Sequence, residues 1–427
     1  MEFNRSNACD EYKQLSRRTV LTGSAMTAAA MILPAWMPKM AFAQSGSGRD
    51  VLISIFLRGG ADSLTLCCPH GDPIYYSERP TIAVPQPGSG SAGKAIDLNG
   101  YFGIPGSMGA LMEAYNNGHL AIVQAVGRDN WSRSHFDAQA RMETESLRNG
   151  QGGWLARHLA TVAPSKADAG VRGFAFTGMM PQILSQAPQT VSTPDPDGFS
   201  FDGRLGISAE IYASLRRQYS RVRDDTRAAF RDGLRAAESL ASVDFGGYQP
   251  SPGAVYSNTE FGQSLKATAA MIRADVGLEV AHIDVHGWDT HANQGSLGGA
   301  LESLMVDLAS NMMAIYRDLG GAGFTRYTVL VQSEFGRQVF ENGCYGTDHG
   351  TGGIMYALGP NVNGGRVVAD WPGLQVENRF EGVDLRPTID SRLVIAELLQ
   401  KRLKNANIGQ VLPGYFPGAT KNIFKAA

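Results

Sequence analysis

Long apolar runs that alternate with amphipathic segments dominate the sequence from residue 51 onward. Four runs have the continuous apolar character of strands that are buried on both faces. They occupy Val51–Leu57, Leu120–Val126, Tyr327–Ser333 and Ile354–Leu358. A fifth run opens the stretch Gly277–Gln294, and Gly173–Thr177 predicts one more short strand.

Helical periodicity predicts most of the segments between these strands. The expected helices are Met108–Asn117, a segment from Ser134 to about Leu147, Ser208 to about Ser239, Thr259–Asp275, Leu297–Leu319 and Asp390 to Lys404. Strands that alternate with helices predict an α/β fold with a mainly parallel sheet flanked by helices. We expect a single domain over residues 44–427, with a surface excursion at 69–98 that is rich in Pro, Gly and Ser.

The first 43 residues predict a cleaved export signal. Ser16–Leu21 carries a twin-arginine pattern, an apolar run follows, and Ala41-Phe42-Ala43 has the form of a cleavage site. Prolines interrupt the apolar run, so we expect a Tat signal peptide over residues 1–43 and no stable membrane span in the mature chain. The protein would be periplasmic or secreted, with the Tat translocon as its partner during export.

The net charge and the cysteines limit the possible binding partners and disulfide bonds. The formal net charge of −2 gives no electrostatic basis for binding nucleic acid. Cleavage of the leader would leave Cys67, Cys68 and Cys344. An oxidising compartment permits one bridge from Cys344 to either of the other two, and a bond within the vicinal pair would be strained.

Polar side chains recur where the predicted strands end. They are Asp62, Ser134 with His135, Asp289 with His291, Glu334, and, slightly further on, Asp348 with His349. Because ligand sites in open α/β sheets lie at the carboxyl ends of the strands, we expect one shared surface there. Carboxylates and imidazoles are ligands for a divalent cation, either zinc or a harder ion such as magnesium or calcium.

Each candidate ligand also has a structural interpretation. Asp289 could cap a helix, and Asp348 could belong to a polar turn that contains His349. Glu334 could form an ion pair with Arg337, and Asp62 could stabilise the turn after Gly59-Gly60. The clustering of candidates favours metal binding for Asp289 and His291, with Trp288 packing beneath them.

Ser134 has two competing interpretations. A serine before a helix, beside Arg133 and His135, suits a nucleophile that attacks a phosphate or sulfate ester. The same serine, with an acidic residue three positions later, also fits an N-cap. Arg58 and Arg337 are candidate clamps for the ester oxygens.

Six segments resemble the domain-of-unknown-function family 1501. They are Phe56–Leu64, Ser132–Gln139, Gly287–Gln294, Ser333–Arg337, Thr347–Gly350 and Gly365–Gly373. Members of this family are typically Tat-exported bacterial proteins, and many are encoded beside a second uncharacterised exported family, which implies a possible exported partner protein. The family looks like a branch of the alkaline phosphatase and sulfatase superfamily.

The superfamily pattern maps onto this chain only in part. It implies metal ligands at Asp62, Asp289, His291, Glu334 and His349, and a nucleophile at Ser134 with Ser132 second. Phe335 stands where the pattern has an imidazole ligand. The resemblance therefore predicts a metal-dependent hydrolase of small-molecule or glycan esters of phosphate or sulfate. The alternative is a non-catalytic envelope or surface-assembly protein that keeps the fold.

Overall fold

The computed structural model describes residues 48–128, 132–146, 152–198, 213–214, 217–219 and 224–426. The predicted Tat signal lies outside these residues, as does the beginning of the helix predicted from Ser208. None of the helices in the described ranges has the length and apolar character needed to cross a bilayer.

A nine-stranded sheet runs through the described residues in the order β10-β4-β9-β8-β1-β7-β5-β6, with β11 paired to β4. Its strands are β1 Val51–Leu57, β4 Leu120–Gly127, β5 Gly173–Ala175, β6 Thr190–Ser192, β7 Val280–Val285, β8 Tyr327–Ser333, β9 Gly353–Leu358, β10 Arg366–Val368 and β11 Ile389–Asp390. A separate pair consists of β2 Ile96–Asp97 and β3 Gly103–Ile104. The predicted α/β fold with a mainly parallel sheet is confirmed.

One strand of the sheet runs against the others. β9 is antiparallel to both β4 and β8, whereas the other pairings of this sheet are parallel. The amino end of β9 therefore lies at the edge where β1, β4, β7 and β8 end. This direction brings residues that precede β9 to the same edge as residues that follow the parallel strands.

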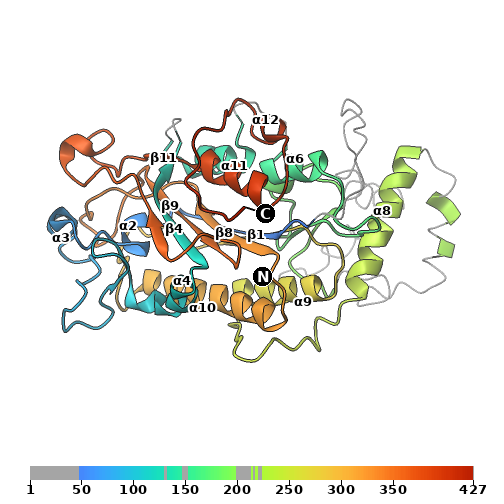
Figure 1. Ribbon diagram of the computed structural model, residues 1–427, viewed down its shortest axis with the longest axis horizontal. Coiled ribbons are helices and arrows are strands. Elements are labelled where there is room, and N and C mark those ends of the chain that lie inside the picture. The colour runs from blue at the N-terminus through green and yellow to red at the C-terminus, as the bar shows by residue number, and fades with distance from the viewer. Residues whose placement is uncertain are drawn as a thin grey trace, which may run out of the picture.

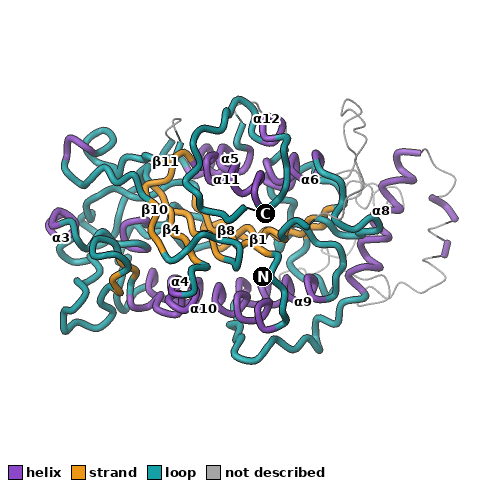
Figure 2. Tube along the Cα trace, viewed as in Figure 1, coloured by secondary structure: helices purple, strands orange, loops and turns teal. Residues whose placement is uncertain are grey.

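Helices cover both faces of the sheet, as Figure 1 shows. α9 (Glu260–Arg273) and α10 (Ala300–Gly321) lie along one face, and α6 (Trp154–Thr161) and α11 (Ser391–Lys401) lie along the other. α5 (His135–Thr144) lies in the second layer near α11 (Figure 2). The remaining helices are α2 Ser63–Leu66, α3 Pro73–Glu78, α4 Met112–Asn116, α8 Asp224–Ala241, α12 Ile408–Val411 and the 3₁₀ helices η2 Gly106–Leu111, η3 Gln182–Leu184 and η4 Val376–Asn378.

The central strands form because their apolar side chains are buried on both faces. In β1, alternate residues such as Ile53 and Leu52 join the two different cores on opposite faces of the sheet. α6 was missed by the sequence prediction because seven of its eight residues are buried. With only eight residues, the helix is also too short for a periodic pattern to stand out.

Two local predictions need correction, and the cysteines, whose pairing the sequence left open, can be assigned. The predicted helix over Met108–Asn117 is a 3₁₀ helix that continues into α4. The helix predicted from Leu297 begins at Ala300, after a glycine-rich turn. Cys67, Cys68 and Cys344 are free thiols, the first two buried and the third exposed, so the structure contains none of the bridges that the sequence permits among them.

Candidate metal centre

Loops after the central strands meet at the carboxyl edge of the sheet. The turn after β1 approaches the loop after β7 so closely that a Cβ on Gly59 would lie 2.4 Å from the backbone nitrogen of Asp289. Gly59 has φ +124°, a conformation that favours glycine. The Gly59-Gly60 turn therefore allows the loop that carries Asp289 to reach the edge.

Three imidazoles converge at this edge. The Nε2 atom of His349 lies 2.9 Å from Nε2 of His135 and 2.9 Å from Nε2 of His291. His135 begins α5, His291 follows β7, and His349 precedes the antiparallel β9. The sequence predicted His291 and His349 as ligands but placed His135 among the catalytic residues.

Asp289 completes this group, which we call the metal-centre cluster: His135, Asp289, His291 and His349. The Asp289 carboxylate lies 3.0 Å from His291 Nε2, 3.2 Å from His349 Nε2 and 3.5 Å from His135 Nε2. The ligand atoms of His135, Asp289 and His349 all lie within 4.8 Å of one another, whereas His291 lies outside this compact group and contacts it through His349 and Asp289. His349 is 23% exposed and Asp289 is 45% exposed, so the cluster is open to solvent.

The other ring nitrogen of each histidine has an acceptor. Glu334 lies 2.9 Å from His135 Nδ1, Asp348 lies 2.9 Å from His291 Nδ1, and the Arg133 carbonyl lies 2.7 Å from His349 Nδ1. Because a carbonyl can only accept, His349 carries its proton on Nδ1. The carboxylates accept from Nδ1 of the other two rings, so all three rings present Nε2 to the cluster.

The carboxylates that face the histidines are held in their ionised form. Burial alone would raise the pKa of Glu334, but hydrogen bonds from Gln139, His135 and the Gly59 amide hold it below its usual value. Hydrogen bonds from His291 and Asn342 lower the pKa of Asp348. Burial lowers the pKa of His349, which disfavours an imidazolium at the centre of the cluster.

Arg337 positions Asp289 from the interior of the protein. Its guanidinium is fully buried and donates to Asp289 Oδ1 at 2.6 Å and to the Thr347 carbonyl at 2.8 Å. Arg337 therefore cannot act as the exposed clamp that the sequence suggested, and Glu334 does not form the alternative ion pair with it. Trp288 is fully buried next to Asp289, as predicted.

Phe335 packs against the imidazoles. Its ring centroid lies 5.0 Å from that of His135 and 5.0 Å from that of His349. A Cβ on Gly60 would collide with the Phe335 ring at 2.3 Å, so the glycine turn also makes room for this side chain. Phe335 replaces a possible ligand with an apolar wall that restricts the orientation of two histidines.

The structure does not bring Asp62 into the metal-centre cluster. Asp62 is fully buried and forms a two-pronged ion pair with Arg79, at 2.5 Å and 3.1 Å. Its oxygens also accept from Thr65 and Gln294, and it is the N-cap of α2. All of these partners are protein groups, which assigns Asp62 to the support of the loops and not to the metal.

Two predicted catalytic residues occupy different surroundings. Ser134 is exposed and occupies the N-cap position of α5, as predicted, but its hydroxyl makes no capping hydrogen bond to the helix. Arg58 donates to Asp284 at 2.7 Å and to Glu143 at 2.6 Å, outside the cluster. Ser134 is therefore available beside the cluster, whereas Arg58 is engaged elsewhere.

Sequence reasoning missed two residues that support the cluster. Gln139 donates to Glu334 at 2.9 Å, and it lies one helical turn after His135 on the same face of α5. Asn342 donates to Asp348 at 3.0 Å and to the His291 carbonyl at 2.9 Å. The i, i+4 spacing could have revealed Gln139, but Asn342 has no comparable signal in the sequence.

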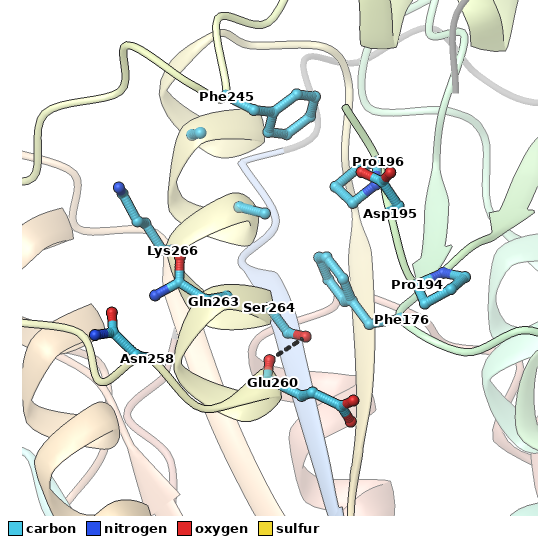
Figure 3. Close-up of a pocket in the computed structure, with 12 residues that line it drawn as sticks. Phe176, Pro194, Asp195, Pro196, Phe245, Asn258, Glu260, Gln263, Ser264 and Lys266 are labelled. Carbon is cyan, nitrogen blue, oxygen red and sulfur yellow. Dashed lines mark hydrogen bonds between the residues drawn. The ribbon is translucent and has the colours of Figure 1, made fainter. Parts of the chain in front are cut away.

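A cavity lies further along the same edge, beyond β7. It has a volume of about 410 Å³ and is lined by Phe176, Pro194, Phe245 and the α9 residues Glu260 and Ser264, among others. Figure 3 shows Phe176 and the proline segment facing α9 across this space. None of its lining residues belongs to the metal-centre cluster, so the cavity is not the metal site.

The fold and the cluster together define an α/β protein with a candidate metal centre at the carboxyl edge of its sheet. The chain belongs to the family described as "Protein of unknown function (DUF1501)", whose model matches residues 107–401. The matched region contains the whole metal-centre cluster. A search of curated proteins found no match.

Proposed function

We propose that this protein is a metal-dependent hydrolase of phosphate or sulfate esters. The observation that carries the proposal is the convergence of three Nε2 atoms and one carboxylate, with each Nδ1 held by an acceptor. Ring nitrogens only 2.9 Å apart need either a shared proton or a metal ion between them. Imidazole nitrogens and a carboxylate are common ligands of metal ions, so these residues fit a metal ion.

The donor types favour zinc over magnesium or calcium. Three imidazoles and one carboxylate form a set typical of zinc, whereas magnesium and calcium prefer oxygen ligands. We infer a single ion, because Asp62 is occupied by Arg79 and Phe335 offers no ligand atom. A divalent ion bound here would lower the pKa of a coordinated water or hydroxyl and offset charge that develops on the ester oxygens.

The residues around the cluster suit ester cleavage. His135, Asp289 and His349 would hold the ion and leave a position open for substrate or water, with His291 beside them, while Glu334 and Asp348 fix the orientation of two of the imidazoles. Ser134, whose hydroxyl is free of the helix, would attack the phosphorus or sulfur atom. The ester bond to the alcohol would break, and water would then release the phosphate or sulfate from the serine.

The test combines metal analysis with turnover. Purified mature protein should contain about one zinc per chain, as expected for a site with three or four protein ligands. It should hydrolyse at least one member of a panel of aryl phosphate and sulfate esters, and chelation should abolish this activity. A metal-free, inactive protein would favour the non-catalytic assembly role instead.

We also propose the superfamily, the export route and the partner protein that the resemblance implies. Strand-end ligands around a mostly parallel sheet support an alkaline phosphatase and sulfatase-like architecture. The twin-arginine pattern at Ser16–Leu21 supports export to the periplasm or beyond. An exported partner protein remains a prediction from the resemblance alone.

We expect Ser134→Ala to reduce turnover at least about 1,000-fold, as loss of a nucleophile does in enzymes of this kind. Zinc content should be unchanged, because Ser134 is not in the cluster. Stability should also be nearly unchanged, because the hydroxyl makes no capping bond. Steady-state kinetics, metal analysis and thermal unfolding would measure these effects. Ser132→Ala is the matched control, and loss of activity in that variant alone would assign the nucleophile to Ser132.

We expect Asp348→Asn to weaken zinc affinity about 10–100-fold, the usual cost of losing an outer partner of a ligating histidine. Asp348 holds His291 Nδ1 and is half exposed, so its replacement should leave the fold intact. Competition with a chromogenic chelator would measure the affinity. Asp137→Asn removes an equivalent charge from a pair with Arg141 outside the cluster and should leave the affinity unchanged.

A further inference from the structure

Carboxyl groups pair with the described arginines around the metal-centre cluster. Within the described ranges, Arg337 pairs with Asp289, Arg141 with Asp137, Arg128 with Glu145, and Arg133 with both Glu381 and Asp384. A cavity of about 30 Å³ beside Glu334 and Phe335 is lined by Arg128 and Arg141, which are both in these pairs. An anionic substrate would therefore find each of these guanidinium groups already paired with a carboxyl group of the protein.

The charges of the centre itself would balance once a divalent ion is bound. The two positive charges of the ion and the charge of Arg337 are matched by the carboxylates of Asp289, Glu334 and Asp348. The amino end of α5, which begins at His135, adds about half a positive charge. The centre is thus only weakly positive, and a weak positive field offsets little of the larger desolvation cost of a second negative charge.

Arg133 is the cation best placed to change this balance. Its carbonyl binds His349, which fixes its backbone beside the cluster. Its guanidinium, however, lies 2.8 Å from Glu381 and 2.7 Å from Asp384. Two carboxylates on one guanidinium give this ion triad a net negative charge, which opposes the approach of a dianion.

We propose that the centre selects tetrahedral esters with a single negative charge, namely sulfate monoesters or phosphate diesters, over doubly charged phosphate monoesters. This inference rests on the proposed hydrolase function and specifies its substrate class. A phosphate monoester carries close to two negative charges at neutral pH. The reaction adds water across the ester bond, so the alcohol leaves with a proton and the acid remains.

The experiment compares three esters of one alcohol with the zinc-loaded protein. The esters are p-nitrophenyl sulfate, methyl p-nitrophenyl phosphate and p-nitrophenyl phosphate. At least one of the two singly charged esters should show a kcat/KM at least tenfold above that of the dianion. An equal or higher value for the dianion would overturn the inference and leave the hydrolase function standing. Turnover of none of the three would overturn the hydrolase function, and the inference with it.

A variant with altered charge tests whether the substrate is selected by its charge or by its shape. Glu381→Gln removes one carboxylate from Arg133 and should raise the ratio of dianion to monoanion kcat/KM at least threefold. Glu377→Gln makes the same change at an exposed residue outside the ion triad, and it should leave the ratio unchanged. An unchanged ratio in the Glu381 variant, or an equal shift in both variants, would contradict selection by the Arg133 triad.

Discussion

The His349→Ala variant should be purified without a stoichiometric metal ion. His349 Nε2 contacts each of the other three residues of the metal-centre cluster. It lies 2.9 Å from both other imidazoles and 3.2 Å from Asp289. Loss of an outer partner costs about 10–100-fold in metal affinity, so loss of this ligand should cost more than about 100-fold. Elemental analysis and chelator competition would measure the change, and ester hydrolysis should disappear with the ion.

His286→Ala provides the matched control for this prediction. His286 is exposed just after β7 and lies outside the metal-centre cluster, so this variant should keep its metal and its activity. Circular dichroism would establish that both variants are folded. Retention of zinc with unchanged affinity in the His349 variant would remove the basis of the proposed function.

The sheet was largely predictable because its strands are marked by local patterns. β1 and β8 have the predicted bounds, and β4 and β9 differ by one residue each. The direction of β9 was not predictable, because an apolar run has the same pattern whichever way it enters a sheet. That direction matters, since it allows His349, which precedes its strand, to meet His291, which follows another.

The candidate ligands were predictable as a set but not in their individual roles. Asp289, His291 and His349 follow from the gathering of polar residues at strand ends. Whether Glu334, Asp348 and His135 bind a metal directly or orient another ligand depends on which ring nitrogen faces which oxygen. Tertiary geometry decides this. Sequence spacing carries no information about those orientations.

Asp62 shows most clearly where sequence reasoning fails. A carboxylate after a glycine turn suits a metal ligand and a buried ion pair equally well. Its partner, Arg79, comes from the segment over residues 69–98, whose composition predicts a surface excursion. Arg79 is nevertheless fully buried and also donates to the carbonyls of Gln338 and Val339. Such pairing between distant segments leaves no local pattern.

Asp62→Asn should destabilise the protein and leave its metal in place. The substitution would leave the Arg79 guanidinium buried without a counter-charge, and breaking a buried pair in this way costs about 3–5 kcal/mol of unfolding free energy. Denaturant unfolding would measure the loss, and elemental analysis of the same samples should still find the zinc content of the wild type.

A second substitution tests whether the uncompensated charge is the cause. Adding Arg79→Met to the Asp62→Asn variant removes the buried charge and should recover part of the lost stability, because an apolar side chain of similar length can fill the same space. Loss of zinc from the single variant, with stability preserved, would instead make Asp62 a ligand. It would also return Asp62 to the set of ligands that the superfamily pattern implies.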